Sequence, residues 1–128
     1  MFEKTKAFSG FAVDDVPKAK EFYGETLGLN VVEESSGDLI LRLAGDRDTL
    51  VYPKEGHTPA EYTILNFPVD DIEAAVDELA GRGVEFERYQ GFDQDEKGIV
   101  HGIDAGQGPD IAWFKDPAGN VLAVLHLG

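Results

Sequence analysis

Two stretches of the chain alternate between apolar and small or polar positions. In residues 7–13, Phe11 and Val13 share one face, opposite Gly10 and Ala12. Residues 62–69 repeat the pattern, with Leu65, Phe67 and Val69 on one face and Tyr62, Ile64 and Asn66 on the other. Because side chains alternate between the two faces of a strand, this period of two predicts a strand in each stretch.

A helical pattern follows each predicted strand. Residues 14–15 and 70–71 are aspartate pairs, whose side-chain oxygens accept hydrogen bonds from the free N–H groups at a helix start. Asp70, with Glu73 three residues later, resembles a capping box. Apolar residues then recur at spacings of three and four, which predicts one buried stripe per helix. The stripes contain Val16, Ala19, Phe22, Tyr23 and Leu27 in the first helix and Ile72, Ala75, Val76, Leu79 and Ala80 in the second.

The two strand–helix stretches are copies of one another. Val13 aligns with Val69, which sets an offset of 56 residues (69 − 13), and the same offset aligns the aspartate pairs. It also aligns Phe11 with Phe67, Val16 with Ile72, and Ala19 with Ala75. A constant offset over this many positions indicates a duplicated structural unit.

Short strands are predicted after each helix, separated by turn residues. They cover 29–34, 38–44 and 48–53 in the first copy, and 84–89, 110–115 and 120–127 in the second. Each copy is therefore a βαβββ module. We predict a single α+β domain over 1–128, built from a module in 1–53, a linker in 54–61 and a module in 62–128. Two such sheets, each with a helix on one face, would form a curved mixed sheet around a cleft.

This arrangement resembles the vicinal oxygen chelate superfamily, which includes glyoxalase I, extradiol dioxygenases, and the fosfomycin and bleomycin resistance proteins. Its most specific marks are FAVDDVPKAKEFYGETLGL at 11–29 and WFKDPAGNVL at 113–122. Together with the repeat, the resemblance covers nearly the whole chain. It implies the glyoxalase/bleomycin resistance fold.

The resemblance also implies where metal ligands would lie. Most enzymes of the superfamily use one divalent ion, held by His, Glu or Gln at matching places in the first and last strands of each copy. Such an ion holds two adjacent substrate oxygens and stabilises an anionic intermediate. At these places the chain has Phe8, Val51, Ile64 and Ala123, and none of these side chains binds a metal. We therefore expect a metal-free branch, with no cofactor and no catalytic residues.

The predicted ligand-binding residues are Phe8, Arg42, Tyr52, Ile64, Asn66, His101, Trp113 and Ala123. Phe8, Ile64 and Ala123 would line an apolar pocket at the places of the metal ligands. Asn66 is a polar residue on the cleft face, so its amide bonds either to a neighbour or to a ligand. Arg42 either meets an anion at the cleft mouth or lies on the surface edge of the sheet. Trp113 and Tyr52 either line the cleft or pack in a core.

Three histidines and one long loop need separate interpretations. His101 is the best histidine for the cleft, but spacing assigns it no partner carboxylate, so a catalytic base is not predicted. His57 is expected to be a solvated linker residue, and His126 to face the helix side or the C-terminal edge. The segment 91–102 is long for a hairpin connection, and it is either a lid or a solvated excursion.

Composition narrows the possible partners. The 128 residues carry a formal net charge of −14, from 11 basic and 25 acidic residues. Nucleic acid and anionic membrane surfaces require a basic face, so we exclude them as partners. No apolar run is long enough to cross a bilayer, and we expect no signal peptide. The absence of cysteine excludes disulfides and fits the reducing cytoplasm, where we expect the protein.

Two classes of function fit the sequence best, and a third is also compatible with it. The first is a binding protein, similar to the bleomycin resistance branch, that holds a small organic molecule in a metal-free cleft. Net acidity favours a cationic ligand. The alternative is a metal-dependent lyase, isomerase or dioxygenase similar to glyoxalase I, and the third interpretation is a regulatory or partner-binding subunit. We also expect a homodimer, the commonest state of a chain this size.

Overall fold

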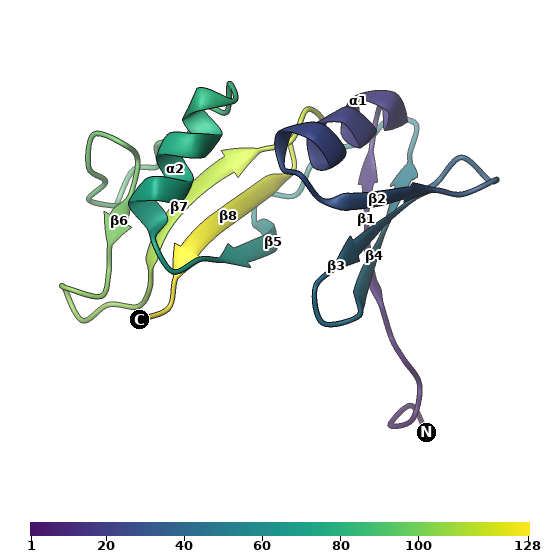
Figure 1. The fold of residues 1–128 in the computed structure, drawn as a ribbon, viewed down its shortest axis with the longest axis horizontal. Helices are drawn as coiled ribbons and strands as arrows, with labels where there is room; N and C mark the ends of the chain where they lie inside the picture. Colours follow the sequence, from purple (N-terminus) through teal and green to yellow (C-terminus); the bar gives the residue numbers. More distant parts are fainter. The chain divides into compact units, whose positions relative to one another are not determined.

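The computed structural model describes all 128 residues, and they divide into two compact units, Met1–Thr58 and Pro59–Gly128. Each unit contains one four-stranded sheet of mixed direction and a helix packed on it (Figure 1). The predicted α+β class with two similar modules is therefore confirmed. Every helix is too short or too polar to traverse a bilayer.

Unit 1 has the strand order β1-β4-β3-β2, in which β1 runs parallel to β4 and the other pairs are antiparallel. Its elements are β1 (Ser9–Val13), α1 (Val16–Glu21), the π-helical turn η1 (Phe22–Thr26), β2 (Asn30–Glu33), β3 (Leu39–Leu43) and β4 (Arg47–Pro53). The π-turn closes through the Leu27 N–H, which donates to the Phe22 carbonyl over 2.9 Å. Gly28 follows with a φ of 71°, in the left-handed region that ends a helix.

Unit 2 repeats this topology, with the order β5-β8-β7-β6 and β5 parallel to β8. Its elements are β5 (Thr63–Pro68), α2 (Ile72–Gly81), β6 (Val100–His101), β7 (Asp110–Lys115) and β8 (Val121–His126). The sheet is the second copy that the sequence repeat predicts.

The strand predicted at 84–89 is wrong. Only an isolated bridge between Phe86 and Phe114 forms there, and β6 occupies the edge position instead. The side chain of Gln94 is the physical reason. It accepts a hydrogen bond from the Tyr89 N–H over 2.9 Å and donates to the Glu87 carbonyl over 2.9 Å. These are the backbone groups that a neighbouring strand would otherwise pair.

Both helices begin at the second aspartate of each pair. Asp15 accepts a hydrogen bond from the Lys18 N–H over 3.0 Å, and Asp71 accepts one from the Ala74 N–H over the same distance. The repeat therefore extends to individual hydrogen bonds. The capping box predicted for Asp70 and Glu73 is wrong by one residue, because Asp71 is the N-cap.

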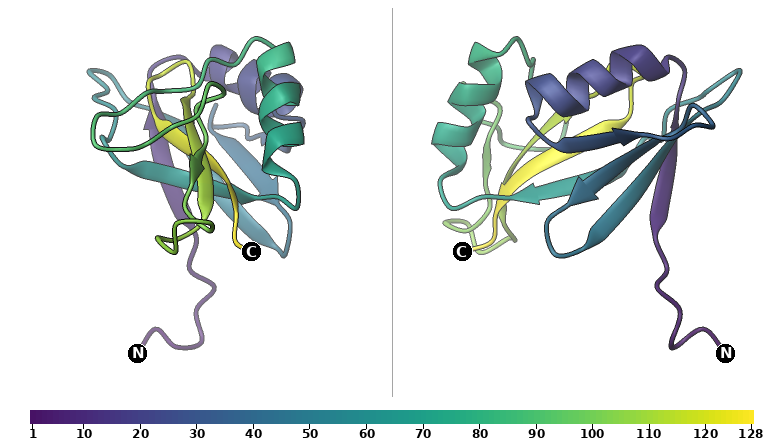
Figure 2. Two further views of the ribbon diagram at one scale, coloured as in Figure 1. Left: turned by 90° about the vertical axis from the view of Figure 1, so that its left-hand side faces the viewer. Right: turned by 45° about the vertical axis from the view of Figure 1, so that its right-hand side comes forward.

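The core of each unit lies between its helix and one face of its sheet (Figure 2). In unit 1 it contains Phe11, Val13, Ala19, Tyr23, Leu39, Leu41 and Val51. In unit 2 it contains Ile72, Val76, Ala112, Phe114, Leu122 and Val124. In each unit the opposite face of the sheet carries no helix of that unit. We call these the outer face of unit 1 and the outer face of unit 2.

Candidate functional site

Strand register brings three predicted site residues together on the outer face of unit 2. Ala123 of β8 pairs with Asn66 of β5 on one side and with Trp113 of β7 on the other. Its neighbours Leu122 and Val124 are buried on the α2 side, so the row of three points the other way. Ala123 is fully buried, whereas Asn66 is exposed and its amide makes no hydrogen bond within the chain.

An aromatic cluster continues this row. The ring of Trp113 lies 5.4 Å from that of Tyr89 and 5.0 Å from that of Phe92, measured between centroids. Burial, followed by the charge of Glu87, raises the pKa of Tyr89, so its phenol stays neutral near pH 7. Phe92 remains 52% exposed. The outer face of unit 2 thus offers aromatic surface beside a free amide, and such a surface can hold a planar organic molecule.

Ile64 lies in an irregularity of β5. Thr63 pairs with Val121 and Leu65 pairs with the next residue, Leu122, so Ile64 is an extra residue between them. This bulge interrupts the strict alternation expected over 62–69 and leaves Ile64 half-buried. A ligand contact at Ile64 stays a prediction.

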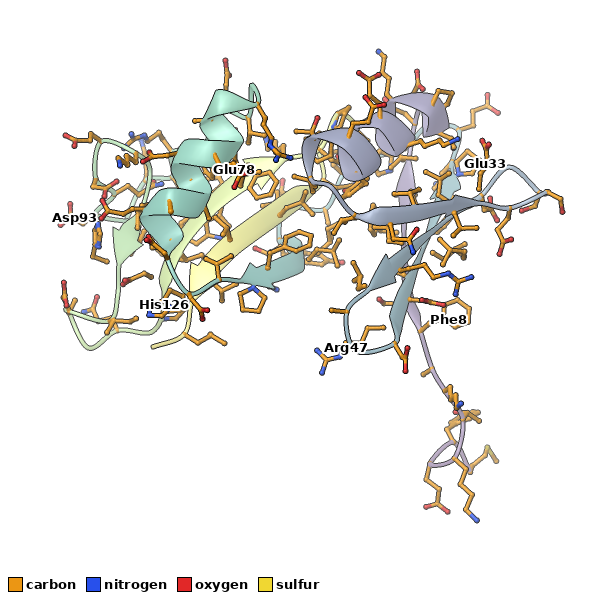
Figure 3. The ribbon with its side chains drawn as sticks, in the orientation of Figure 1. Phe8, Glu33, Arg47, Glu78, Asp93 and His126 are labelled. Atoms are coloured by element: carbon orange, nitrogen blue, oxygen red, sulfur yellow. The ribbon has the colours of Figure 1, made fainter.

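The outer face of unit 1 carries Phe8, Arg42 and Tyr52. Phe8 precedes β1 and is 69% exposed (Figure 3). Arg42 is directly opposite Asp48 in the ladder, and Arg42 Nη1 lies 2.9 Å from Asp48 Oδ2. Its guanidinium therefore already has an anionic partner. Tyr52 alternates with the buried Val51, so its ring lies on the outer face.

The expectation that Val51 stands at a ligand position is wrong. Val51 pairs with Phe11 and Leu39, which are both buried on the α1 side. The outer-face residues of the same strand are Asp48, Leu50 and Tyr52. The position of the fourth implied ligand was therefore aligned one residue off. Because side chains alternate between the two faces of a strand, an error of one residue places a side chain on the opposite face.

The side chains present do not fit a metal ion of the kind that the resemblance implies. Phe8, Ile64 and Ala123 have no ligand atoms, and Val51 faces the core. No group of three or more His, Cys, Asp and Glu side chains that could hold an ion occurs in the structure. We therefore derive no step that runs through a metal.

His101 lies on a different face from the one expected. It pairs with Asp110, whose alternating neighbours Ala112 and Phe114 are buried on the α2 side. His101 consequently belongs to the helix side of the sheet and not to the face of Trp113. Contact with a ligand stays a prediction for this residue.

The structure also supplies the partner carboxylate that spacing could not assign. His101 Nε2 lies 2.7 Å from Oδ2 of Asp95, six residues earlier. This hydrogen bond is the main reason why the pKa of His101 is raised above its ordinary value. Partial burial raises the pKa of Asp95, but the hydrogen bonds from His101, Ile99 and Lys97 outweigh it and lower that pKa overall.

The other two histidines have structural positions. His126 Nδ1 lies 3.0 Å from the Val69 carbonyl oxygen, on the side expected for it (Figure 3). His57 is not the solvated residue that was expected, because its Nε2 atom is buried and has no hydrogen-bond partner.

The segment 91–102 is hydrogen-bonded to residues 87–89 of unit 2. Gln94 also donates to the Gly98 carbonyl over 2.8 Å, and Arg88 donates to the Asp95 and Glu96 carbonyls. Asp95 Oδ1 accepts from the N–H groups of Lys97 and Ile99. Sequence reasoning missed both Gln94 and Asp95. The run DEKG at 95–98 was the available signal, because aspartate at the first and glycine at the fourth position are typical of a type I turn.

Three solved structures show how widely this fold occurs. A glyoxalase family protein from Enterococcus faecalis aligns with 98% of this chain and 99% of its own, at 23% identity and a TM-score of 0.67. TnmS3, an antibiotic binding protein from Streptomyces sp. CB03234, aligns over 98% of each chain at 23% identity and a TM-score of 0.66. A superfamily member from Sphaerobacter thermophilus DSM 20745 aligns over 94% and 96%, at 21% identity and a TM-score of 0.66. These likenesses show the fold alone.

No curated protein matches the sequence. The sequence model of one family, however, matches residues 7–124, which is most of the chain. With that match and the two-module architecture, the chain belongs to the Glyoxalase/Bleomycin resistance protein/Dioxygenase superfamily.

Proposed function

We propose that this protein binds a small organic molecule on the outer face of unit 2 and that it does so without a metal ion. The observation that carries the proposal is the exposed amide of Asn66 and the aromatic cluster of Trp113, Tyr89 and Phe92, which lie on either side of the buried Ala123. A free amide beside aromatic rings provides one directional hydrogen bond and a large apolar contact, which is the usual composition of a small-molecule site.

The chemistry of the face indicates the class of ligand. Stacked aromatic side chains favour a planar or aromatic molecule. The net charge of −14 favours a cation over an anion, because the field of the whole chain attracts positive ligands. One of the similar structures is an antibiotic binding protein, and this supports a binding role for the fold without identifying a ligand here.

The test uses proflavine, a planar cationic dye, and the fluorescence of the single tryptophan, Trp113. We expect saturable quenching by the dye on chelator-treated protein. Asn66→Ala should weaken binding about fivefold, since one hydrogen bond contributes about 1 kcal/mol. Asn30→Ala is the matched control, because Asn30 is also an exposed asparagine on a strand, but in unit 1. Unchanged affinity for Asn66→Ala would remove the proposal.

A calorimetric titration with zinc, nickel, manganese and iron(II) tests the metal-free part. We expect no heat of binding from any of these ions. Tight one-to-one binding of an ion would overturn the metal-free proposal and favour the enzyme alternative.

Two further parts of the proposal concern the whole protein. We propose a homodimer, and equilibrium sedimentation showing a monomer at tens of micromolar would remove it. Ligand contacts at Phe8, Arg42 and Tyr52 on the outer face of unit 1 stay predictions, as does the cytoplasmic location.

A further inference from the structure

A pocket of about 280 Å³ opens among the loops around β6 in unit 2. Its polar and aromatic lining comes from Phe92, Asp93, Asp95, His101 and Gln107. Figure 3 shows Asp93 on these loops, at the edge of the unit beside β6. The pocket is distinct from the row on the outer face, and only Phe92 borders both.

The wall of this pocket is built by close backbone packing. Gln107 N–H donates to the Gly102 carbonyl over 2.8 Å, which closes the turn between β6 and β7. A Cβ atom at Gly102 would clash with the carbonyl oxygens of Pro109 and Gly108, so only glycine fits there. The turn that forms this wall of the pocket is therefore tightly packed.

The imidazole of His101 is held in one orientation. Asp95 Oδ1 accepts two backbone N–H groups, and its Oδ2 lies 2.7 Å from His101 Nε2. Because a carboxylate only accepts, Nε2 carries the proton in the neutral ring. Nδ1 is then a hydrogen-bond acceptor, and it has no partner within the chain.

The charges around the pocket select the class of ligand. Asp93 and Asp95 are the acidic lining residues, and neither lysine nor arginine lines the pocket. Phe92 adds an aromatic ring, whose face attracts cations. We propose that this pocket binds a small organic cation with an ammonium N–H, which donates to Nδ1 of His101, pairs with Asp93 and rests against Phe92.

Protonation of His101 should compete with this ligand. The acidic groups that face His101 are Asp95 in the same loop, Asp110 on β7 and Glu73 on α2. Two cationic side chains lie nearby: Lys97 is paired with Asp77 of α2 over 3.1 Å, and Arg88 donates to the Asp95 and Glu96 carbonyls. These acids keep His101 protonated to a higher pH than usual. Binding of the cation therefore weakens as the pH falls through the raised pKa of His101.

The experiment compares three probes that share one ring: benzylammonium, benzyl alcohol and benzoate. Each is titrated into ¹⁵N-labelled protein, and amide shifts are followed by NMR. We expect saturable shifts within 91–107 for benzylammonium, weaker shifts for the alcohol and none for benzoate. Benzoate binding as well as benzylammonium, or the absence of saturable shifts within 91–107, would overturn the proposal.

Two variants make the test specific. Asp93→Asn should weaken benzylammonium binding about fivefold, while Glu96→Gln, the same charge change on an exposed residue outside the pocket, should not. His101→Gln keeps a donor for Asp95 and should abolish the pH dependence between about pH 6 and 8. Equal effects of Asp93→Asn and Glu96→Gln, or a pH dependence that survives in His101→Gln, would contradict the proposal.

The two proposed sites can fail separately. Shifts at Asn66, Ala123 and Trp113 report the outer face of unit 2, whereas shifts within 91–107 report the loop pocket. Loss of one set leaves the other proposal standing.

Discussion

The side chain of Gln94 bonds three backbone groups of unit 2, so its removal should lower the stability of this unit. Its side chain accepts from the Tyr89 N–H and donates to the carbonyls of Glu87 and Gly98, over 2.8 to 2.9 Å. Gln94→Ala breaks all three hydrogen bonds. At about 1 kcal/mol for each bond, the free energy of unfolding should fall by about 3 kcal/mol.

The assay is urea denaturation followed by circular dichroism, together with hydrogen exchange at the Tyr89 amide. Gln90→Ala is the matched control, since Gln90 is an exposed glutamine in the same segment and no hydrogen bond of its side chain occurs in the structure. The control should change the free energy of unfolding by less than about 0.5 kcal/mol. In Gln94→Ala, the Tyr89 amide should exchange much faster than in the parent protein.

Gln94→Glu provides a sharper version of this test. Glutamate keeps the acceptor for the Tyr89 N–H but cannot donate to the two carbonyls, so it should be as destabilising as alanine or worse. A loss below about 1 kcal/mol in both variants, with unchanged exchange at Tyr89, would refute the assignment of 84–89 as a segment held by a side chain.

Three further predictions follow from single contacts. Asp15→Ala and Asp71→Ala remove the N-caps and should each lower the free energy of unfolding by about 1 kcal/mol. The controls Asp14→Ala and Asp70→Ala should change it little. Equal effects within an aspartate pair would contradict the assigned N-caps. Gly119→Ala should lower the free energy of unfolding by about 1 kcal/mol or more, because Gly119 has a φ of 91° and a Cβ would lie 3.0 Å from Pro59. The control is Gly81→Ala in α2, where a Cβ meets no atom and the free energy of unfolding should not fall. The His101–Asp95 pair should stabilise the fold most between about pH 4 and 6.5. Its histidine part is lost as the pH rises through the raised pKa of His101, and its carboxylate part as the pH falls through the lowered pKa of Asp95. In the parent protein the denaturation midpoint should fall as the pH rises through the pKa of His101, and in His101→Gln this fall should be absent. A fall that persists in the variant would show that another group causes it.

Much of the fold follows from the sequence, because the repeat doubles every local signal. The aspartate pair, the apolar stripe and the alternating strand occur twice, and each occurrence supports the other. The failure at 84–89 has a physical cause. The valine and the two aromatic residues of this segment do favour a strand, but the side chain of Gln94 bonds the Tyr89 N–H and the Glu87 carbonyl. No periodicity in 84–89 contains that information.

The site was harder to predict than the fold. Alternation predicts the face of Asn66, the resemblance implies the position of Ala123, and the sequence leaves Trp113 open between the cleft and a core. The strand register shows that the three residues lie side by side. Val51 lies on the opposite face from the one implied, because the resemblance was aligned one residue off within a correctly predicted strand. His101 lies in the short strand β6, which the sequence predicts as part of a loop, so no alternation was available to give its face. The partnership of Asp95 with His101 depends on the course of a loop, which spacing alone does not give.

The errors and the successes have a common cause, because packing constrains the residues on only one face of each sheet. The helix-side positions of each strand are fixed by packing, since Leu39, Leu41, Val51, Leu122 and Val124 are almost completely buried. Asn66 and Phe8 lie outside these cores and are free to change without loss of the fold. The same fold can therefore persist while the groups on the outer faces of its sheets change. For this reason membership of the superfamily assigns the fold of this protein but does not assign its function.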